Sequence, residues 1–226
     1  MDWRGQRAPV RANRERALLS HIWNWARERG LTKLANPCRG VRGFRERGRD
    51  IYVSDAVFAA VYAHASEPLR DAMDLAYLSG QRPADVLRLS WADVRDGVIA
   101  LRQAKTGAAL RIEVTPAVQD VLDRIAARQR EARISDLAVI QGRDGRRLSA
   151  AALRGAFDRA RRAAAAAAPA LAAQVKAFQF RDLRAKAGTD QAERGGLLEA
   201  RRQLGHSSVA MTEQYVRMGP RVKPTR

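Results

Sequence analysis

Apolar residues recur three to four positions apart along most of the chain, which is the spacing of side chains on one face of a helix. Serine or proline precedes several of these stretches and glycine follows them, as is typical of helix starts and ends. These signals predict helices over residues 13–29 with Asn13 as N-cap, from Ser54, from Pro68 to Gly80, from Pro83, from Pro116, from Ser149, and over 182–193, 197–204 and 209–217.

A different period appears in two short stretches near the middle of the chain. Residues 98–102 and 110–114 favour strands, and Thr106-Gly107 between them is typical of a hairpin turn. Residues 137–140 predict one further brief strand. The fold class is therefore mainly α, of the α+β kind: a helical domain with a small antiparallel β-sheet.

A linker is predicted between residues 39 and 49, where three glycines and five arginines leave little that could be buried. We place a domain boundary near Gly48, which gives segments 1–48 and 49–226. The first segment holds one predicted helix, and a single helix cannot close a hydrophobic core. It therefore resembles the end of a longer domain.

The charge is the most informative feature of the composition. The chain has 42 Lys and Arg but only 24 Asp and Glu, which gives a net charge of +18. Such an excess predicts a polyanionic partner, and 37 of the basic residues are arginines, which bind phosphate oxygens in a bidentate way. The single cysteine, Cys38, excludes an internal disulfide framework. The sequence contains no run of 18 apolar residues, so we expect a cytoplasmic protein without a membrane partner.

Several common kinds of site are excluded by the sequence motifs. The chain has no GxxxxGK[ST], no HExxH and no GxSxG, and its three histidines make a multi-histidine metal centre improbable. We therefore expect no metal and no cofactor, and chemistry on a polyanion remains.

Six residues stand where such chemistry would need them. Arg82 lies between Gly80 and Pro83 at a helix start, where phosphate is favoured. The others are Arg181 and Arg184, three positions apart near another helix start, Lys105 beside the hairpin turn, and His206 and Tyr215, nine positions apart. Taken singly, each also fits an ordinary surface arginine, turn lysine or half-buried tyrosine.

Their order and spacing are more specific. Arg82, Lys105, Arg184, His206 and Tyr215, within SGQRPADVLRLSW, QAKTG, RDLRAKAG, LGHSS and TEQYVR, resemble the catalytic constellation of the tyrosine recombinases, the phage integrase family. The resemblance runs from about residue 51 to 219. It extends more weakly over 13–41, which looks like the last helix and exit of the family's core-site DNA-binding domain.

The resemblance implies a DNA breaking-rejoining enzyme that acts on double-stranded DNA, in tetramers on paired sites and with DNA-bending accessory factors as further partners. By resemblance, Arg82 and Arg184 clamp the non-bridging phosphate oxygens and Tyr215 attacks to give a 3′-phosphotyrosyl link. Lys105 protonates the departing 5′-hydroxyl, and His206 hydrogen-bonds the phosphate. Asp85 matches an acidic residue that family members often place three positions after the first arginine.

Arg181 departs from the family pattern, which usually has histidine there. Arginine cannot accept a proton at neutral pH. Either Arg181 adds a third phosphate contact while water or the phosphate accepts the phenolic proton, or the enzyme is weakened.

Two other functions stay open: DNA relaxation of the type IB topoisomerase kind, and a DNA-binding prophage remnant or regulator without activity. The basic tail, with Arg217, Arg221, Lys223 and Arg226, is expected either to exchange between protomers or to contact DNA.

Overall fold

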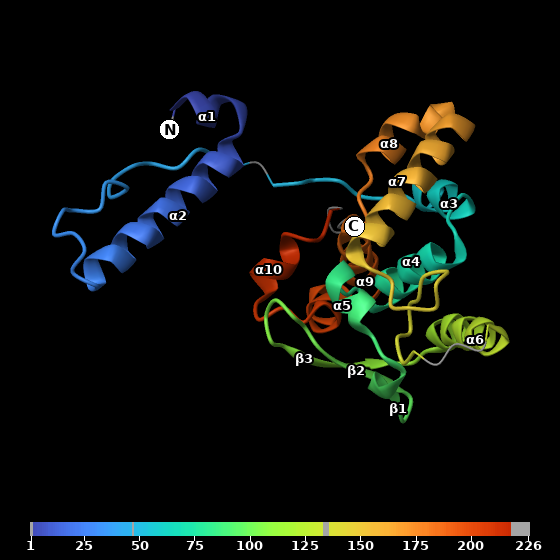
Figure 1. Ribbon diagram of the computed structural model, residues 1–226. Coiled ribbons are helices and arrows are strands. Elements are labelled where there is room, and N and C mark those ends of the chain that lie inside the picture. Colours follow the sequence, from blue (N-terminus) through green and yellow to red (C-terminus); the bar gives the residue numbers. More distant parts are fainter. Residues whose placement is uncertain (1, 47, 133–135, 218–226) are drawn as a thin grey trace, which may run out of the picture. The chain divides into compact units, whose positions relative to one another are not determined.

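The computed structural model describes residues 2–46, 48–132 and 136–217 (Figure 1). The chain divides into two compact units, residues 1–50 and 51–226, next to the segment rich in arginine and glycine. Tail residues Arg221, Lys223 and Arg226 lie outside the described residues, so the expectation for the tail stays a prediction.

The first unit contains α1 (Asp2–Arg7) and α2 (Pro9–Glu28). α1 was not predicted, and α2 begins four residues before the predicted start at residue 13. It can begin there because Pro9 occupies its first turn, where a residue needs no partner for a backbone N–H. Asn13 is therefore inside the helix and is not its N-cap. Its side chain instead bonds the backbone O and N of Phe44, each at 2.8 Å.

Packing in this unit is sparse. The Phe44 ring lies so close to Gly5 that an added Cβ would come within 1.9 Å of it, which requires glycine there. Among the described residues of the unit, Ala12 is the one buried apolar side chain, with 1% exposure. Large apolar side chains of the unit stay exposed, namely Trp3, Val10, Leu18, Leu19, Ile22, Trp25, Leu31, Leu34 and Val41.

The second unit holds most of the helices, as Figure 1 shows. They are α3 (Asp55–Ala63), α4 (Glu67–Ser79), α5 (Pro83–Arg88), α6 (Pro116–Glu131), α7 (Ala150–Ala167), α8 (Ala172–Ala177), α9 (Asp182–Leu204) and α10 (Val209–Glu213), with 3₁₀ turns at Trp91–Asp93 and Pro169–Leu171. Ser54, Ser149 and Ser208 cap α3, α7 and α10 by accepting a backbone N–H.

Most helix predictions in this unit are confirmed, with three differences. α8 was not predicted, and α10 ends at Glu213, before the predicted residue Arg217. α9 is broken at Gly196, where φ of 84° and ψ of 171° leave the helical region, so the two predicted segments 182–193 and 197–204 are its two halves.

The sheet has three antiparallel strands in the order β1 (Val94–Arg95), β2 (Val98–Arg102) and β3 (Ala109–Glu113). The predicted hairpin is confirmed, with Leu101 opposite Leu110. β1 was missed because it is only two residues long. The strand predicted over 137–140 is wrong: this segment makes an isolated bridge from Ala138 to Ser90.

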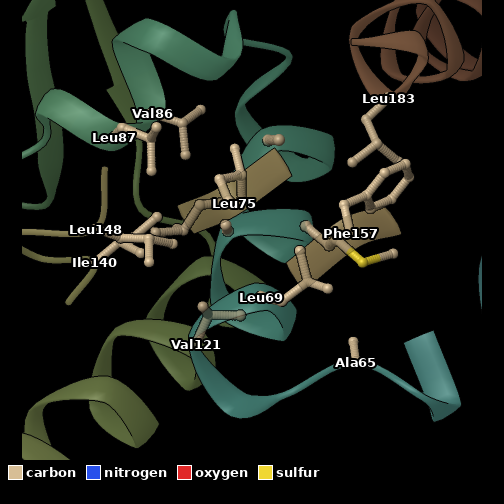
Figure 2. Close-up of a cluster of buried hydrophobic side chains, with 14 of the residues drawn as sticks. Ala65, Leu69, Leu75, Val86, Leu87, Val121, Ile140, Leu148, Phe157 and Leu183 are labelled. Atoms are coloured by element: carbon tan, nitrogen blue, oxygen red, sulfur yellow. The ribbon is translucent and has the colours of Figure 1, made fainter. Parts of the chain in front are cut away.

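The core of the second unit surrounds α4 (Figure 2). Leu69 and Leu75 of α4 lie with Val121 of α6, Phe157 of α7 and Leu183 of α9 in one buried cluster. Each such side chain stabilises the fold by about 1.5 to 3 kcal/mol on burial. Leu183 anchors the N-terminal end of α9 in this core, and the C-terminal end of α9 is tied to the end of α4 by the hydrogen bond from Gln81 Nε2 to Gln203 O.

In the described part of the chain, no helix combines the length and the apolar character that crossing a membrane requires.

Candidate active site

Arg82 lies in the link between α4 and α5. α4 ends at Gly80, whose φ of 67° is left-handed, and Pro83 in the first turn of α5 favours the extended backbone of Arg82 (φ −68°, ψ 151°). The Arg82 guanidinium donates to Gln103 Oε1 at 2.6 Å and lies 3.9 Å from Asp85 Oδ2. A neutral amide therefore orients this cation at closer range than any carboxylate among the described residues.

Arg184 lies in the first turn of α9 and is buried, with 3% exposure. Its Nη1 donates to Gly80 O at 2.8 Å, and its Nη2 donates to Leu204 O at 2.6 Å. Burial, followed by repulsion from Arg82, lowers the pKa of Arg184 to about 10. The guanidinium is still charged at neutral pH. Because its charge is desolvated and close to that of Arg82, a bound anion would stabilise it.

His206 follows Gly205, which ends α9 in the left-handed region (φ 63°). A Cβ at Gly205 would lie 2.9 Å from Gln103 Nε2, so only glycine lets the chain pass there. Burial, and then repulsion from Arg184 and Arg82, lowers the pKa of His206 to about 4, so the ring is neutral at pH 7.

The hydrogen bonds of His206 determine its tautomer. Nε2 lies 3.1 Å from Arg184 Nη2, which can only donate, so Nε2 accepts and carries no proton. Nδ1 then carries the proton and donates to Thr212 Oγ1 at 3.1 Å. In this state His206 faces the arginines with a lone pair.

Tyr215 lies in the turn that follows α10. Its backbone N–H donates to Thr212 O at 2.8 Å, and its ring centroid lies 4.8 Å from that of His206. Arg184 Cζ lies 5.5 Å from the Tyr215 ring centroid, and interaction with Tyr215 partly opposes the lowering of the Arg184 pKa. The structure thus brings together four of the six predicted residues, from α5, α9 and the two segments after α9.

Lys105 and Arg181 are not part of these contacts. Lys105 is exposed in the turn between β2 and β3, and Arg181 is exposed at the N-cap of α9. Neither side chain has a hydrogen bond or ion pair within the described ranges. Lys105 is nevertheless only two positions from Gln103, the partner of Arg82.

Sequence reasoning missed the polar residues behind the cluster. Gln103 (1% exposed) holds Arg82, and Thr189 (0% exposed) accepts from Arg217 N at 2.9 Å and lies 3.3 Å from Tyr215 O. For Gln103 one signal was available. In the alternation of β2 it falls on the same inward face as Ile99, and a polar residue at such a position is unusual. For Thr189 no pattern in the chain gave a signal.

No group of three or more His, Cys, Asp or Glu side chains suited to a metal ion comes together in the portion of the chain that the structure describes.

The sequence pattern of the phage integrase family matches residues 54–220, a stretch that contains all six predicted residues. The chain belongs to the phage integrase family. The integrase of Escherichia phage HK022 is 30% identical over 186 residues, which are 80% of this chain and 50% of that protein. The chain therefore spans about half the length of this integrase.

Solved structures agree with the family. A lambda integrase dimer bound to a COC′ core site is similar with a TM-score of 0.76 and 22% identity, over 95% of this chain and 62% of that one. A lambda integrase tetramer bound to a Holliday junction gives a TM-score of 0.73 and 22% identity, over 92% of this chain and 61% of that one. At this identity the likeness shows that the chain has the integrase fold.

Proposed function

We propose that this chain carries the catalytic domain of a site-specific recombinase that cleaves and rejoins DNA strands through a 3′-phosphotyrosyl intermediate. The observation that carries the proposal is the position of Tyr215, with its ring 4.8 Å from that of His206 and 5.5 Å from the guanidinium carbon of Arg184. A phenol nucleophile and two phosphate-binding groups thus belong to one site of one chain.

In the first step the Tyr215 oxygen attacks the phosphorus of a DNA phosphodiester. The new bond joins phosphorus to the phenolic oxygen, and the bond from phosphorus to the 5′-oxygen breaks. Negative charge builds up on the non-bridging oxygens, and Arg82 and Arg184 stabilise it. The buried Nε of Arg184 has no hydrogen-bond partner among the described residues.

His206 acts on the same phosphate. Its Nε2 accepts from Arg184 in the absence of DNA. A bound phosphate would take this donor and would raise the pKa of the histidine by its negative charge. The protonated ring then donates to a phosphate oxygen.

Lys105 supplies the proton for the departing 5′-oxygen. Its place in an exposed turn suits an ammonium that reaches out to DNA. The phenolic proton passes to water or to a phosphate oxygen, because Arg181 cannot accept it. Arg181 instead adds a third cationic contact to the phosphate.

The reaction is reversible without ATP, because the phosphotyrosyl bond keeps the energy of the broken phosphodiester. Attack by a 5′-hydroxyl from a second duplex gives strand exchange. The substrate is double-stranded DNA, and the net charge of +18 favours its binding. We expect a tetramer on paired sites, with DNA-bending accessory factors, and we expect residues 1–48 to contribute DNA contacts.

A nicked duplex tests the proposal, because loss of the short 5′-product traps the covalent intermediate. The cognate site is first selected from randomised duplexes by binding. Adduct formation is then measured at a protein concentration that saturates the DNA in a mobility-shift assay. We expect a denaturant-resistant adduct with the wild type and none with Tyr215→Phe.

Tyr62→Phe is the matched control, since the Tyr62 hydroxyl bonds Asp74 at 2.7 Å within the α3–α4 pair, apart from the cluster. It should form adduct like the wild type. Salt-sensitive binding without any adduct would contradict the proposal and support a non-catalytic DNA-binding protein. Relaxation of supercoiled DNA without site preference would instead support topoisomerase-like activity.

A further inference from the structure

A buried glutamine at the end of β2, Gln103, links the parts of the proposed site that lie on different elements. We infer that Gln103 is a positioning residue, whose amide holds Arg82 and the turn of Lys105 in one arrangement against the end of α9. The inference rests on the proposed function, because it concerns the groups that would bind the phosphate and protonate the leaving oxygen.

The side-chain amide of Gln103 uses all of its hydrogen-bonding positions inside the protein. Its Nε2 donates to Gln81 Oε1 at 2.8 Å and to Leu204 O at 2.9 Å. Its Oε1 accepts from Arg82 Nη1 at 2.6 Å and from Thr106 Oγ1 at 2.8 Å. The amide is thus fixed by four partners, and at 1% exposure water does not compete with them.

These partners come from three elements. Arg82 is the N-cap of α5, Thr106 belongs to the hairpin turn, and Leu204 ends α9. Gln81 continues the connection, because its own Nε2 donates to Gln203 O at 2.8 Å. A displacement of any one element is therefore transmitted to the other two through a single side chain.

The turn that carries Lys105 has two more ties at its base. Gly107 N donates to the backbone O of Gln103 at 2.9 Å, and Ala104 N donates to Asp85 Oδ1 at 2.8 Å. Ala104 and Gly107, which lie on either side of Lys105, are therefore held by hydrogen bonds, while the lysine side chain is exposed. The position of the Lys105 backbone relative to Arg82 thus depends on the backbone around Gln103.

A neutral amide suits this position better than a charged group. Its oxygen orients Arg82 and adds no negative charge to that of Asp85, which lies 3.9 Å from the guanidinium. A glutamate at this position would pair with Arg82, and it could not donate to Gln81 Oε1 or to Leu204 O. A methionine would keep the length of the side chain but would lose all four hydrogen bonds.

The test compares Gln103→Met with Gln129→Met. Gln129 is also buried, and its amide accepts from Trp91 Nε1 at 2.7 Å and donates to Ala138 O and Val139 O. Loss of this second amide network should lower the denaturation temperature to a similar extent, but it touches none of the site residues. Gln129→Met therefore reports the effect of a purely structural loss.

Single-turnover adduct formation on saturating nicked DNA gives the catalytic readout. We expect Gln103→Met to slow it on the order of 10-fold to 100-fold, with DNA affinity within about 3-fold of the wild type, because misplaced groups lose rate more than binding. Gln129→Met should react like the wild type. Equal rates for the two variants would overturn the inference.

A second substrate distinguishes the effect of Gln103 on Lys105 from its effect on Arg82. A duplex with a 5′-bridging sulfur at the scissile bond releases a thiolate, which needs no proton donor. This substrate should fully restore Lys105→Ala and partly restore Gln103→Met, and it should not change Gln129→Met relative to the wild type. If Gln103→Met gained nothing, a link between Gln103 and Lys105 would be excluded.

A third readout does not depend on activity. Hydrogen exchange of the Ala104 and Gly107 amides in the DNA-free protein should become faster in Gln103→Met and should stay unchanged in Gln129→Met. If the wild type formed no adduct, the proposed function would fail, while this exchange would still test the role of Gln103. Unchanged exchange at both amides in Gln103→Met would overturn that role.

Discussion

Arg184 is the residue whose replacement should separate catalysis from stability most clearly. In Arg184→Met, Gly80 O and His206 Nε2 lose their hydrogen bonds from the guanidinium, at 2.8 Å and 3.1 Å, while Leu204 O keeps the bond from Gln103. Each of these two acceptors that is left without a donor costs about 1 to 3 kcal/mol. The variant also loses a desolvated cation whose pKa is lowered from 12.5 to about 10. Removal of this buried charge stabilises the folded state by about 3 kcal/mol.

These contributions oppose each other, so we expect the free energy of unfolding of Arg184→Met to lie within about 3 kcal/mol of the wild type. Adduct formation should nevertheless fall about 100-fold to 1,000-fold, because a preorganised phosphate donor is lost. Urea denaturation with an unchanged slope gives the stability, and the nicked-duplex assay gives the rate.

Arg161→Met is the matched control. Arg161 Nη1 also donates to two backbone carbonyls, Lys176 O at 2.9 Å and Phe178 O at 2.8 Å, but it lies on α7, outside the site. It should lose about 1 to 3 kcal/mol of stability and no activity. A loss above about 4 kcal/mol in Arg184→Met, or an unchanged rate, would refute the reasoning that the cation is kept for function.

Three further predictions follow from the same cluster. The pKa of His206 is about 4 when folded and near 6.5 when unfolded, so its contribution to stability is complete above pH 6.5 and is lost as the pH falls toward 4. His206→Gln should lose less stability than the wild type between these pH values in urea denaturation, and an identical loss would contradict the assignment. Thr189→Val should slow adduct formation roughly tenfold and Thr189→Ser should retain it, because only the hydroxyl can hold the Tyr215 segment. Arg181→His should speed the adduct step by roughly tenfold or more, with a new dependence on pH near 6.5, and no gain would mean that transfer of the phenolic proton does not limit the rate.

Much of the fold could be predicted because its signals are local. Ser54 and Ser149 each precede a helix and accept a backbone N–H of its first turn, and the period of two over 98–102 matches β2. The misses have physical causes as well. Segment 137–140 has the composition of a strand, but its backbone pairs with the irregular segment around Ser90 rather than with a sheet.

The candidate site was predictable only in part. The order of motifs indicated Arg82, Arg184, His206 and Tyr215, which lie far apart in the chain and meet only in the fold. Their supporting contacts, such as the four hydrogen bonds of Gln103, depend on the ends of three elements meeting at one point. No local pattern encodes such a meeting.

The central claim is that the hydroxyl of Tyr215 becomes covalently bound to DNA. The most direct measurement is tandem mass spectrometry of the trapped complex after digestion with protease and nuclease. The account predicts a nucleotide joined through its 3′-phosphate to Tyr215 in the peptide that contains TEQYVR. An attachment at any other residue, or an unmodified Tyr215 when the DNA is demonstrably bound, would contradict it.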